Sequence, residues 1–181
     1  MQPVSPAATR YDTTTIIFHW ITAILVTTQW LGAQIIDWFP KGAPRVDARS
    51  VHITCGVLLV FILLARLIWR ATKGRRLPLA DSAALSVIAK GAHWGLYALL
   101  TAMLLVGLAL TWTRGDSIFN LFTLPKFDPG NKALADQVQE VHATIGWIIV
   151  AVAGLHASAA LFHRYVLRDT VLSRMLPRAG R

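Results

Sequence analysis

Histidine is the residue type in this sequence whose placement suggests chemistry. Two short segments, HITCG (His52–Gly56) and HATIG (His142–Gly146), each open a long apolar run with a histidine and place a glycine four residues later. The chain has six histidines, and all of them lie in or beside apolar runs. An ionisable side chain inside a membrane is costly, so its presence there indicates a function. Histidine is also the commonest metal ligand among side chains.

Apolar composition indicates where these histidines are held. Hydrophobic residues make up 55% of the 181 residues and charged residues only 15%, with a mean hydropathy of +0.51. A bilayer-spanning helix needs roughly 20 mostly apolar residues, and four runs qualify, at about 16–36, 51–69, 92–112 and 141–162. We predict an all-α integral membrane four-helix bundle, a single transmembrane domain over 1–181. The first run is predicted to be a retained span, because it is too long for a signal-peptide core and no small-residue cleavage site follows it.

Charge is distributed unevenly between the two predicted faces. Residues 1–15, 66–91 and 163–181 hold twelve basic and three acidic side chains, whereas residues 37–50 and 113–141 hold six of each. Lysine and arginine beside spans are retained in the cytoplasm, so both termini are expected to be cytoplasmic. The high isoelectric point, about 10.6, is then explained by topology and by contact with anionic lipid, and not by nucleic-acid binding.

The topology sorts the histidines into two levels. His142 and His156 are 14 residues apart in the last span, close to four helical turns, so they share a face and lie about 21 Å apart. His52 falls at the depth of His142 near the outer surface, and His19 falls at the depth of His156 near the inner surface. Each level therefore combines one histidine of the fourth span with one from another helix.

Two facing imidazoles suit haem b, whose iron takes two axial nitrogens while its ring fills the gap between helices. The sequence therefore predicts two non-covalent, bis-histidine haems. Gly56 and Gly146 lie one turn deeper than their histidines, where a missing side chain would let a porphyrin edge approach. Thr54 and Thr144 point elsewhere and receive no ligand role. No Cys-x-x-Cys-His motif for covalent haem occurs, and the lone Cys55 lies within a span.

Structural hydrogen bonding and metal transport are the competing roles for these histidines. A single membrane histidine is commonly an interhelical hydrogen-bonding group, and small residues are common at helix contacts. Zinc or iron transport also uses paired histidines, but it usually brings carboxylates into the spans, and none occurs in the interior here. Two matched levels without carboxylates favour haem.

Several motifs together resemble the bacterial cytochrome b561 family, four-helix membrane cytochromes related to the b-type subunits of membrane hydrogenases and formate dehydrogenases. The resemblance covers nearly the whole chain. Besides HITCG and HATIG, it rests on RYD (Arg10–Asp12), FHW (Phe18–Trp20), RLIWR (Arg66–Arg70), HWGLY (His93–Tyr97), GLHASAALFHRYVLRD (Gly154–Asp169) and LSRML (Leu172–Leu176).

This resemblance implies the same pairing of ligands: His19 with His156 for the cytoplasmic haem, and His52 with His142 for the outer haem. It also implies a multi-pass protein of the bacterial inner membrane that moves electrons between a donor and the quinone pool. Some members of the family are thought to oxidise superoxide and reduce quinone. Superoxide is small and anionic and could reach the outer haem past Lys41, Arg45 or Arg49, although acidic residues in the same loops leave no net field.

The remaining inner-level residues admit more than one role. His93 could replace His19 as a ligand, or border the cytoplasmic haem or a quinone pocket. His163 and Arg164 are candidates for quinone or propionate contact, but they also suit a solvated membrane interface. Arg66 and Arg70 are candidates for propionate pairing, and charge at the end of a span would explain them equally well.

Two functions follow from these features. The first is a stand-alone di-haem oxidoreductase linked to quinone, in which both irons have filled axial positions and pass electrons without binding substrate. The second is a haem b membrane-anchor subunit that relays electrons from a partner dehydrogenase or hydrogenase, with the long outer loop as its docking surface. The physiological donor, the direction of electron flow and the oligomeric state are left open by the sequence.

Overall fold

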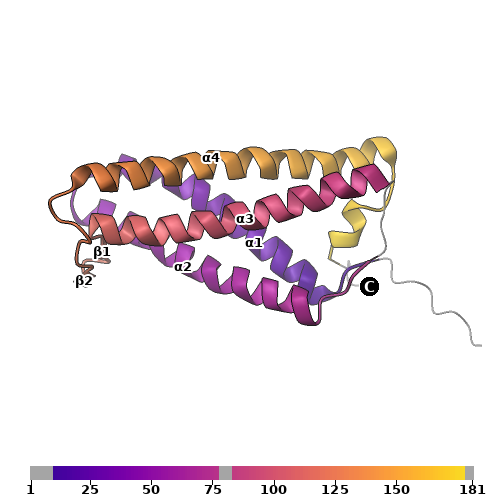
Figure 1. Cartoon of the computed structure of the whole chain (residues 1–181), viewed down its shortest axis with the longest axis horizontal. Coiled ribbons are helices and arrows are strands. Elements are labelled where there is room, and N and C mark those ends of the chain that lie inside the picture. The colour runs from indigo at the N-terminus through magenta and orange to yellow at the C-terminus, as the bar shows by residue number, and fades with distance from the viewer. Residues whose placement is uncertain (1–9, 78–82, 178–181) are drawn as a thin grey trace, which may run out of the picture.

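Four long helices make up most of the chain (Figure 1). The computed structural model describes residues 10–77 and 83–177, and its helices are α1 (Thr13–Ile35), α2 (Ala43–Thr72), α3 (Ala83–Arg114) and α4 (Lys132–Phe162). Within this part of the chain, four helical segments are long and apolar enough to cross a membrane. The prediction of an all-α membrane four-helix bundle is confirmed.

All four helices begin before the apolar runs that predicted them, and three of them begin well before. Helices α2, α3 and α4 start at Ala43, Ala83 and Lys132, whereas the runs start near residues 51, 92 and 141. A helix satisfies its own backbone hydrogen bonds in water as well as in lipid. Polar turns therefore continue the helices beyond the bilayer, and hydropathy indicates only the apolar part. Helix α1 starts at Thr13, close to the start of its apolar run. It ends at Ile35 and passes into a short 3-10 helix, Ile36–Trp38.

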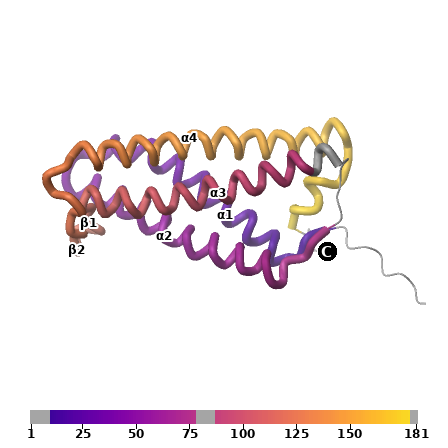
Figure 2. The backbone as a smooth tube through the Cα atoms, in the orientation of Figure 1, coloured from indigo at the N-terminus to yellow at the C-terminus, as the bar shows by residue number. Residues whose placement is uncertain are grey.

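The helices pack as two hairpins (Figures 1 and 2). Helices α1 and α2 lie side by side and form the first hairpin, and α3 and α4 form the second hairpin, while contact between α2 and α3 is sparser. The connection from α3 to α4 contains a two-stranded antiparallel ribbon, β1 (Ser117–Ile118) and β2 (Phe122–Thr123). This ribbon lies at the opposite end of the bundle from the C-terminus (Figure 1).

A small apolar core lies between the hairpins. Leu63 of α2, Leu100 of α3 and Ile149 of α4 are buried against one another, and Val26 of α1 and Met103 of α3 pack around them. Many other large apolar side chains are exposed on the outside of the bundle, as expected for a surface that faces lipid.

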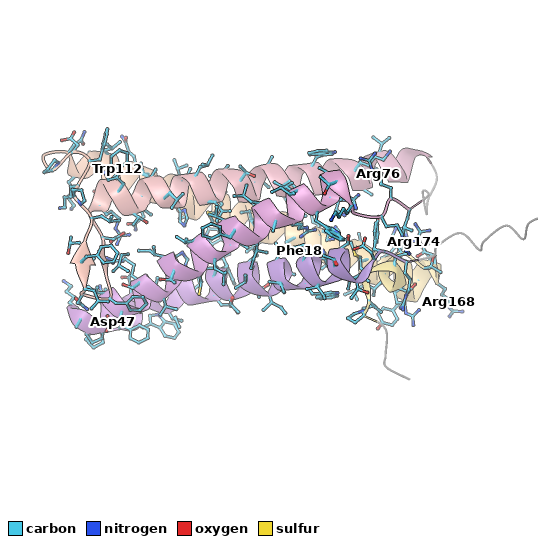
Figure 3. The ribbon with its side chains drawn as sticks, turned by 90° about the horizontal axis from the view of Figure 1, so that it is seen from below. Phe18, Asp47, Arg76, Trp112, Arg168 and Arg174 are labelled. Carbon is cyan, nitrogen blue, oxygen red and sulfur yellow. The ribbon has the colours of Figure 1, made fainter. Side chains whose placement is uncertain are left out.

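The two ends of the described chain meet at one end of the bundle. Arg10 Nε donates to the carbonyl of Ser173 at 2.9 Å, the Tyr11 amide donates to the carbonyl of Arg174, and Trp20 Nε1 donates to the carbonyl of Met175 at 2.8 Å. Figure 3 shows Arg76, Arg168 and Arg174 at this end and Asp47 and Trp112 at the other. Some charged residues used to predict orientation lie outside the described residues: Asp81, Arg178 and Arg181. Cytoplasmic placement of the termini stays a prediction.

Asp12, the last residue of the RYD motif, holds this end together. Its carboxylate caps α1 by accepting from the Thr15 amide at 2.8 Å and from the Thr15 hydroxyl at 2.7 Å. It also accepts from Trp69 Nε1 at 3.1 Å and from the Arg75 amide at 3.0 Å, so it ties the start of α1 to the end of α2. Partial burial opposes ionisation, but these hydrogen bonds dominate and lower the pKa of Asp12 to about 2.

We expect Asp12→Asn to lower the free energy of unfolding by about 1–2 kcal/mol at neutral pH, because a helix cap and a charge-assisted hydrogen-bond network are weakened. The pKa of folded Asp12 lies below the ordinary 3.8. Its ionised form therefore stabilises the protein fully above pH 3.8, and this contribution is lost as the pH falls toward 2. Thermal unfolding in detergent at a series of pH values measures the effect.

The matched control is Asp47→Asn, which removes an outer carboxylate that accepts one exposed hydrogen bond, from Asn120 Nδ2 at 3.0 Å. This variant should unfold within a degree or so of the unsubstituted protein. Equal melting temperatures for the two variants at neutral pH would contradict the role given to Asp12.

Candidate functional site

His52 of α2 and His142 of α4 face each other across the outer half of the bundle. Their ring centroids are 6.3 Å apart and the ring planes make an angle of 78°. Among the described residues, the Nδ1 atoms of both rings are buried without a hydrogen-bond partner. Buried polar atoms are normally paired, so two orphaned imidazole atoms at one place indicate a site for a group that the protein chain does not itself supply. The predicted outer pair is therefore brought together.

A cavity of about 490 Å³ surrounds this pair. It is lined from all four helices, including Val26 of α1, Leu59 of α2 and Leu104 of α3, and mostly by apolar side chains. Its volume lies within the range of cofactor pockets in proteins, roughly 300–1,000 Å³. Gly56 and Gly146 both line it, whereas Thr54 and Thr144 are exposed on the outside of their helices.

Close approach explains why glycine occurs at three positions of this cavity. A Cβ atom on Gly107 of α3 would lie 3.1 Å from Cε1 of His142, and one on Gly146 would lie 3.1 Å from the terminal methyl of Met103. At Gly56 the neighbour is Gln29 of α1, at 3.3 Å. Each glycine therefore makes room for a side chain that lines the cavity.

Sequence reasoning missed Gly107 and Gln29. Gln29 Nε2 donates to the backbone carbonyl of His52 at 2.8 Å and so fixes the helix turn that carries this histidine. A polar amide within the first apolar run is a visible signal, but an amide is not ionisable and so was not among the predicted site residues. Gly107 carries no signal in the sequence, because its role depends on the contact between α3 and α4.

The inner half of the bundle gathers three histidines. His19 of α1 and His156 of α4 have ring centroids 6.3 Å apart, with planes at 64°. His93 of α3 is nearer to His156, at 5.2 Å. His156 thus lies between two candidate partners, His19 and His93. His93 is close to His156, as both of its predicted roles, ligand or neighbour of the inner haem, require.

Distance distinguishes the two candidate inner pairs. An imidazole nitrogen lies about 2 Å from a bound metal ion and about 1.1 Å from its ring centre, so two rings on opposite sides of one iron have centroids roughly 6 Å apart. The spacings of 6.3 Å for His52 with His142 and for His19 with His156 fit this geometry, and 5.2 Å for His93 with His156 is too short. At the outer level the spacing and the two orphaned Nδ1 atoms both fit haem, and at the inner level the spacing fits it.

The same residues do not fit an ion held by protein ligands alone. Residues 10–77 and 83–177 contain no group of three or more His, Cys, Asp and Glu side chains placed to hold a metal. Transported or structural zinc takes three or four such ligands, whereas haem iron already has four porphyrin nitrogens and needs two more. This geometry favours haem over the metal-transport alternative.

Arg66 lies beside the inner histidines, and Arg70 lies farther toward the end of the bundle. The guanidinium of Arg66 stacks over the ring of Tyr97 at 5.2 Å, and its charge acts on His19, His93 and His156. That of Arg70 stacks over Tyr11 at 5.6 Å, where the chain ends meet. The charge of Arg70 acts on His93 as well, so both arginines are near the inner site, and Arg66 is the one that also acts on His19 and His156.

His163 belongs to a different arrangement, at the exit of α4. Its Nδ1 lies 2.5 Å from Oδ2 of Asp169, across a π-helical turn (His163–Leu167) that ends with Arg168 in the left-handed conformation. Slight burial opposes ionisation of Asp169, but the hydrogen bonds from His163 and from the Val171 amide hold the pKa of that carboxyl below its usual range. Arg164 is exposed on the same turn.

The three outer cations expected to steer an anion have different surroundings. Arg45 forms an ion pair with Asp37 at 3.3 Å and donates to the carbonyl of Phe39. Arg49 forms an ion pair with Asp116 at 3.3 Å and lines the outer cavity, whereas Lys41 is exposed in the connection between α1 and α2. Of the three, Arg49 is the one that reaches the cavity.

Comparison with known proteins supplies independent evidence. Residues 10–178 match a family model described as prokaryotic cytochrome b561. Among curated proteins, the chain is 33% identical over 175 residues to cytochrome b561 homolog 1 of Escherichia coli K12, covering 93% of this chain and 98% of that protein. It is also 28% identical over 173 residues to a probable superoxide oxidase, CybB, of Yersinia pestis, covering 93% and 97% of the two chains.

Gly107 offers a test of the outer cavity. We expect Gly107→Ala to push the His142 ring away and to weaken haem binding there by about tenfold, a typical cost of disturbing a metal ligand from its neighbouring shell. Gly95→Ala in the same helix is the control, because a Cβ there meets nothing within 4 Å. That variant should keep its haem and gain up to about 1 kcal/mol from helix propensity.

Haem absorbance per chain and the melting temperature of both purified variants measure these effects. If both variants retained equal haem and were equally stabilised, the contact assigned to Gly107 would be wrong.

Proposed function

Because the chain belongs to the prokaryotic cytochrome b561 family of haem-b membrane cytochromes, we propose that it is a di-haem cytochrome that exchanges electrons between a periplasmic donor and the quinone pool. Electron transfer in the bacterial inner membrane follows from the family. The number of haems, their ligands and the identity of both redox partners are the proposal. The observation that carries it is the pair of equal histidine spacings, 6.3 Å at each level.

In this proposal His52 and His142 hold the outer haem, and His19 and His156 hold the inner haem. A haem b held by two imidazoles would supply a one-electron carrier without an open position for substrate. The protein contributes fixed imidazoles, three glycines that make room for the side chains lining the outer cavity, and apolar walls that exclude water. His93 borders the inner site as a neighbour of His156 and is not a ligand.

The two sites are separated by the apolar core. Leu63, Leu100 and Ile149 are buried there, and His142 and His156 are about 21 Å apart along α4. A dry separation at this depth suits electron passage from one membrane face toward the other while protons and water are kept out. The excess of basic residues at the end where the termini meet supports a cytoplasmic inner face.

Quinone is the proposed lipid-soluble partner. His93 is exposed on the surface of the bundle beside His156, and an imidazole there can hydrogen-bond a quinone oxygen and accept or donate its proton. The His163 and Asp169 pair lies at the same end of the bundle and is a second place for proton exchange. Superoxide is proposed as the outer donor because one relative carries the name of a probable superoxide oxidase.

We expect about two b-type haems per chain in the detergent-solubilised protein, since each iron takes two imidazoles. Replacing any one of His19, His52, His142 or His156 by alanine should lower the ratio to about one, because one pair is broken and the other remains. His93→Ala is the control, with the ratio unchanged. Pyridine haemochrome analysis against protein concentration gives these ratios.

Loss of a haem in His93→Ala, with retention in His19→Ala, would require the inner pair to be reassigned to His93 and His156. A ratio of one in the unsubstituted protein would leave only one of the two levels as a haem site.

Reduced quinol should exchange electrons with the haems in the absence of any partner protein. Stopped-flow mixing of the oxidised protein with a short-chain quinol follows the reaction through haem absorbance. His93→Gln keeps hydrogen-bonding capacity but cannot be protonated, so it should slow reduction by quinol more than reduction by dithionite.

No reaction with any quinol, together with fast reduction by a co-purifying dehydrogenase, would favour the membrane-anchor function instead. Equal rates of quinol reduction in His93→Gln and the unsubstituted protein would remove His93 from the quinone site.

A further inference from the structure

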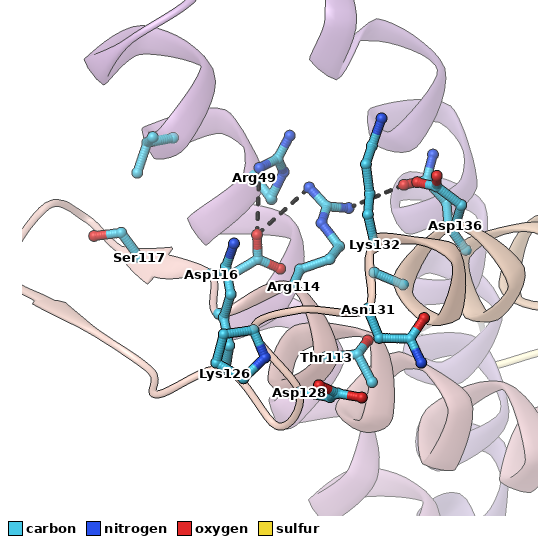
Figure 4. A pocket seen from close by; sticks show the side chains of 15 residues that line it. Arg49, Thr113, Arg114, Asp116, Ser117, Lys126, Asp128, Asn131, Lys132 and Asp136 are labelled. Atoms are coloured by element: carbon cyan, nitrogen blue, oxygen red, sulfur yellow. Dashed lines mark hydrogen bonds and ion pairs between the residues drawn. The ribbon is translucent and has the colours of Figure 1, made fainter.

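Two arginines share one buried carboxylate at the outer mouth of the bundle. Oδ1 of Asp116 lies 3.3 Å from Nη1 of Arg49 and 3.4 Å from Nη2 of Arg114 (Figure 4). The Asp116 side chain is only 6% exposed, and those of Arg49 and Arg114 are 28% and 23% exposed. Arg114 also donates from Nη1 to Oε1 of Gln139 at 3.4 Å. The cluster joins α2, α3 and the loop that follows α3.

The same cluster lines the cavity that contains His52 and His142. Arg49, Arg114 and Asp116 border this cavity, and they also border a second pocket of about 520 Å³ on the outer side. Asp37 is the other acidic residue of the cavity wall, and it is already paired with Arg45 at 3.3 Å. Arg45, which does not line the cavity, takes up Asp37, so Arg49 and Arg114 share the single carboxylate of Asp116, and one positive charge is left in excess at the edge of an apolar cavity.

An excess buried charge is costly unless an anion compensates it. A guanidinium has a planar fork of donors that suits a carboxylate in particular. One oxygen of Asp116 takes one nitrogen from each arginine, so most of both forks remains for another acceptor. Haem b itself carries carboxylate side chains, the propionates, at one edge of its ring.

We propose that Arg49 and Arg114 bind the propionates of the outer haem, and that Asp116 is a positioning residue that holds the two guanidinium groups at the mouth of the cavity. This inference rests on the proposed function, because it requires a haem between His52 and His142. It differs from the sequence prediction, in which Arg49 was a steering charge for superoxide and the propionate candidates were Arg66 and Arg70.

Anchoring of the outer loop alone would not require this cluster. The buried hydroxyl of Ser50 accepts from the Phe119 amide at 2.8 Å and donates to the carbonyl of Val46 at 2.7 Å, with the carbonyl of Ser117 3.3 Å away. Asn120 of the same loop donates to Asp47 of α2. Because these contacts fix the loop to α2 independently, loss of one arginine charge should leave the loop folded and change the environment of the haem.

The test compares Arg49→Gln, Arg114→Gln and the double variant with the unsubstituted protein. Lys132→Gln is the control, since Lys132 borders the outer pocket but not the cavity of His52 and His142. Resonance Raman spectroscopy follows the propionate bending band, and potentiometric titration of haem absorbance follows the two haems separately.

Each arginine variant should shift the propionate band and lower the midpoint potential of one haem, because a nearby positive charge favours the reduced iron. The double variant should shift the band and the midpoint potential further. Compared with Arg49→Gln, Arg49→Lys should regain part of the midpoint potential but not the position of the band, because lysine keeps the charge without the planar fork of donors. If a glutamine variant fails to fold, Arg49→Lys and Asp116→Asn provide the same Raman comparison.

An unchanged propionate band in the double variant, with two haems bound, would overturn this inference and leave the proposed function intact. A double variant that is reduced more slowly by an anionic donor, with the band unchanged, would likewise overturn it and assign the cluster to a diffusing anion. An unsubstituted protein without an outer haem would overturn the proposed function together with this inference.

Discussion

The pairing of histidines between the two helical hairpins is the constraint on which the rest of the structure depends. His19 and His52 lie on the first hairpin, and their partners His156 and His142 both lie on α4 of the second. The hairpins are closely packed internally and less closely against each other. Imidazoles facing each other without a shared proton or metal gain little inside a membrane. A group bound between them would therefore hold the hairpins together as well as carry electrons.

The architecture follows from this requirement. A spacing of 14 residues on α4 returns to the same face after nearly four turns, so one straight helix can serve both levels. Glycines at 107 and 146 bring α3 close to α4 without filling the outer cavity. Leu63, Leu100 and Ile149 then close the space between the levels. At the inner end, Asp12 fixes α1 to α2, which positions His19 two turns away.

Features with a periodic or compositional signature could be predicted from the sequence, and contacts between distant residues could not. Four apolar runs indicated the four helices, and the depth of each histidine indicated both close pairs. Arg49 with Asp116 spans 67 residues, and Trp69 with Asp12 spans 57, so neither leaves a local pattern. Counting charges over whole loops predicted a neutral outer face, and it could not show that Arg49 and Arg114 meet over one buried carboxylate at the cavity mouth.

Electron paramagnetic resonance of the oxidised protein tests the central claim most directly, because it reports the axial ligands of each ferric iron. Two imidazoles on each iron predict two low-spin signals and no high-spin signal. Ring planes turned by 64° and 78° predict that both are of the strongly anisotropic type. A high-spin signal accounting for about one iron per chain, or a single low-spin species with one haem per chain, would contradict the two bridging histidine pairs.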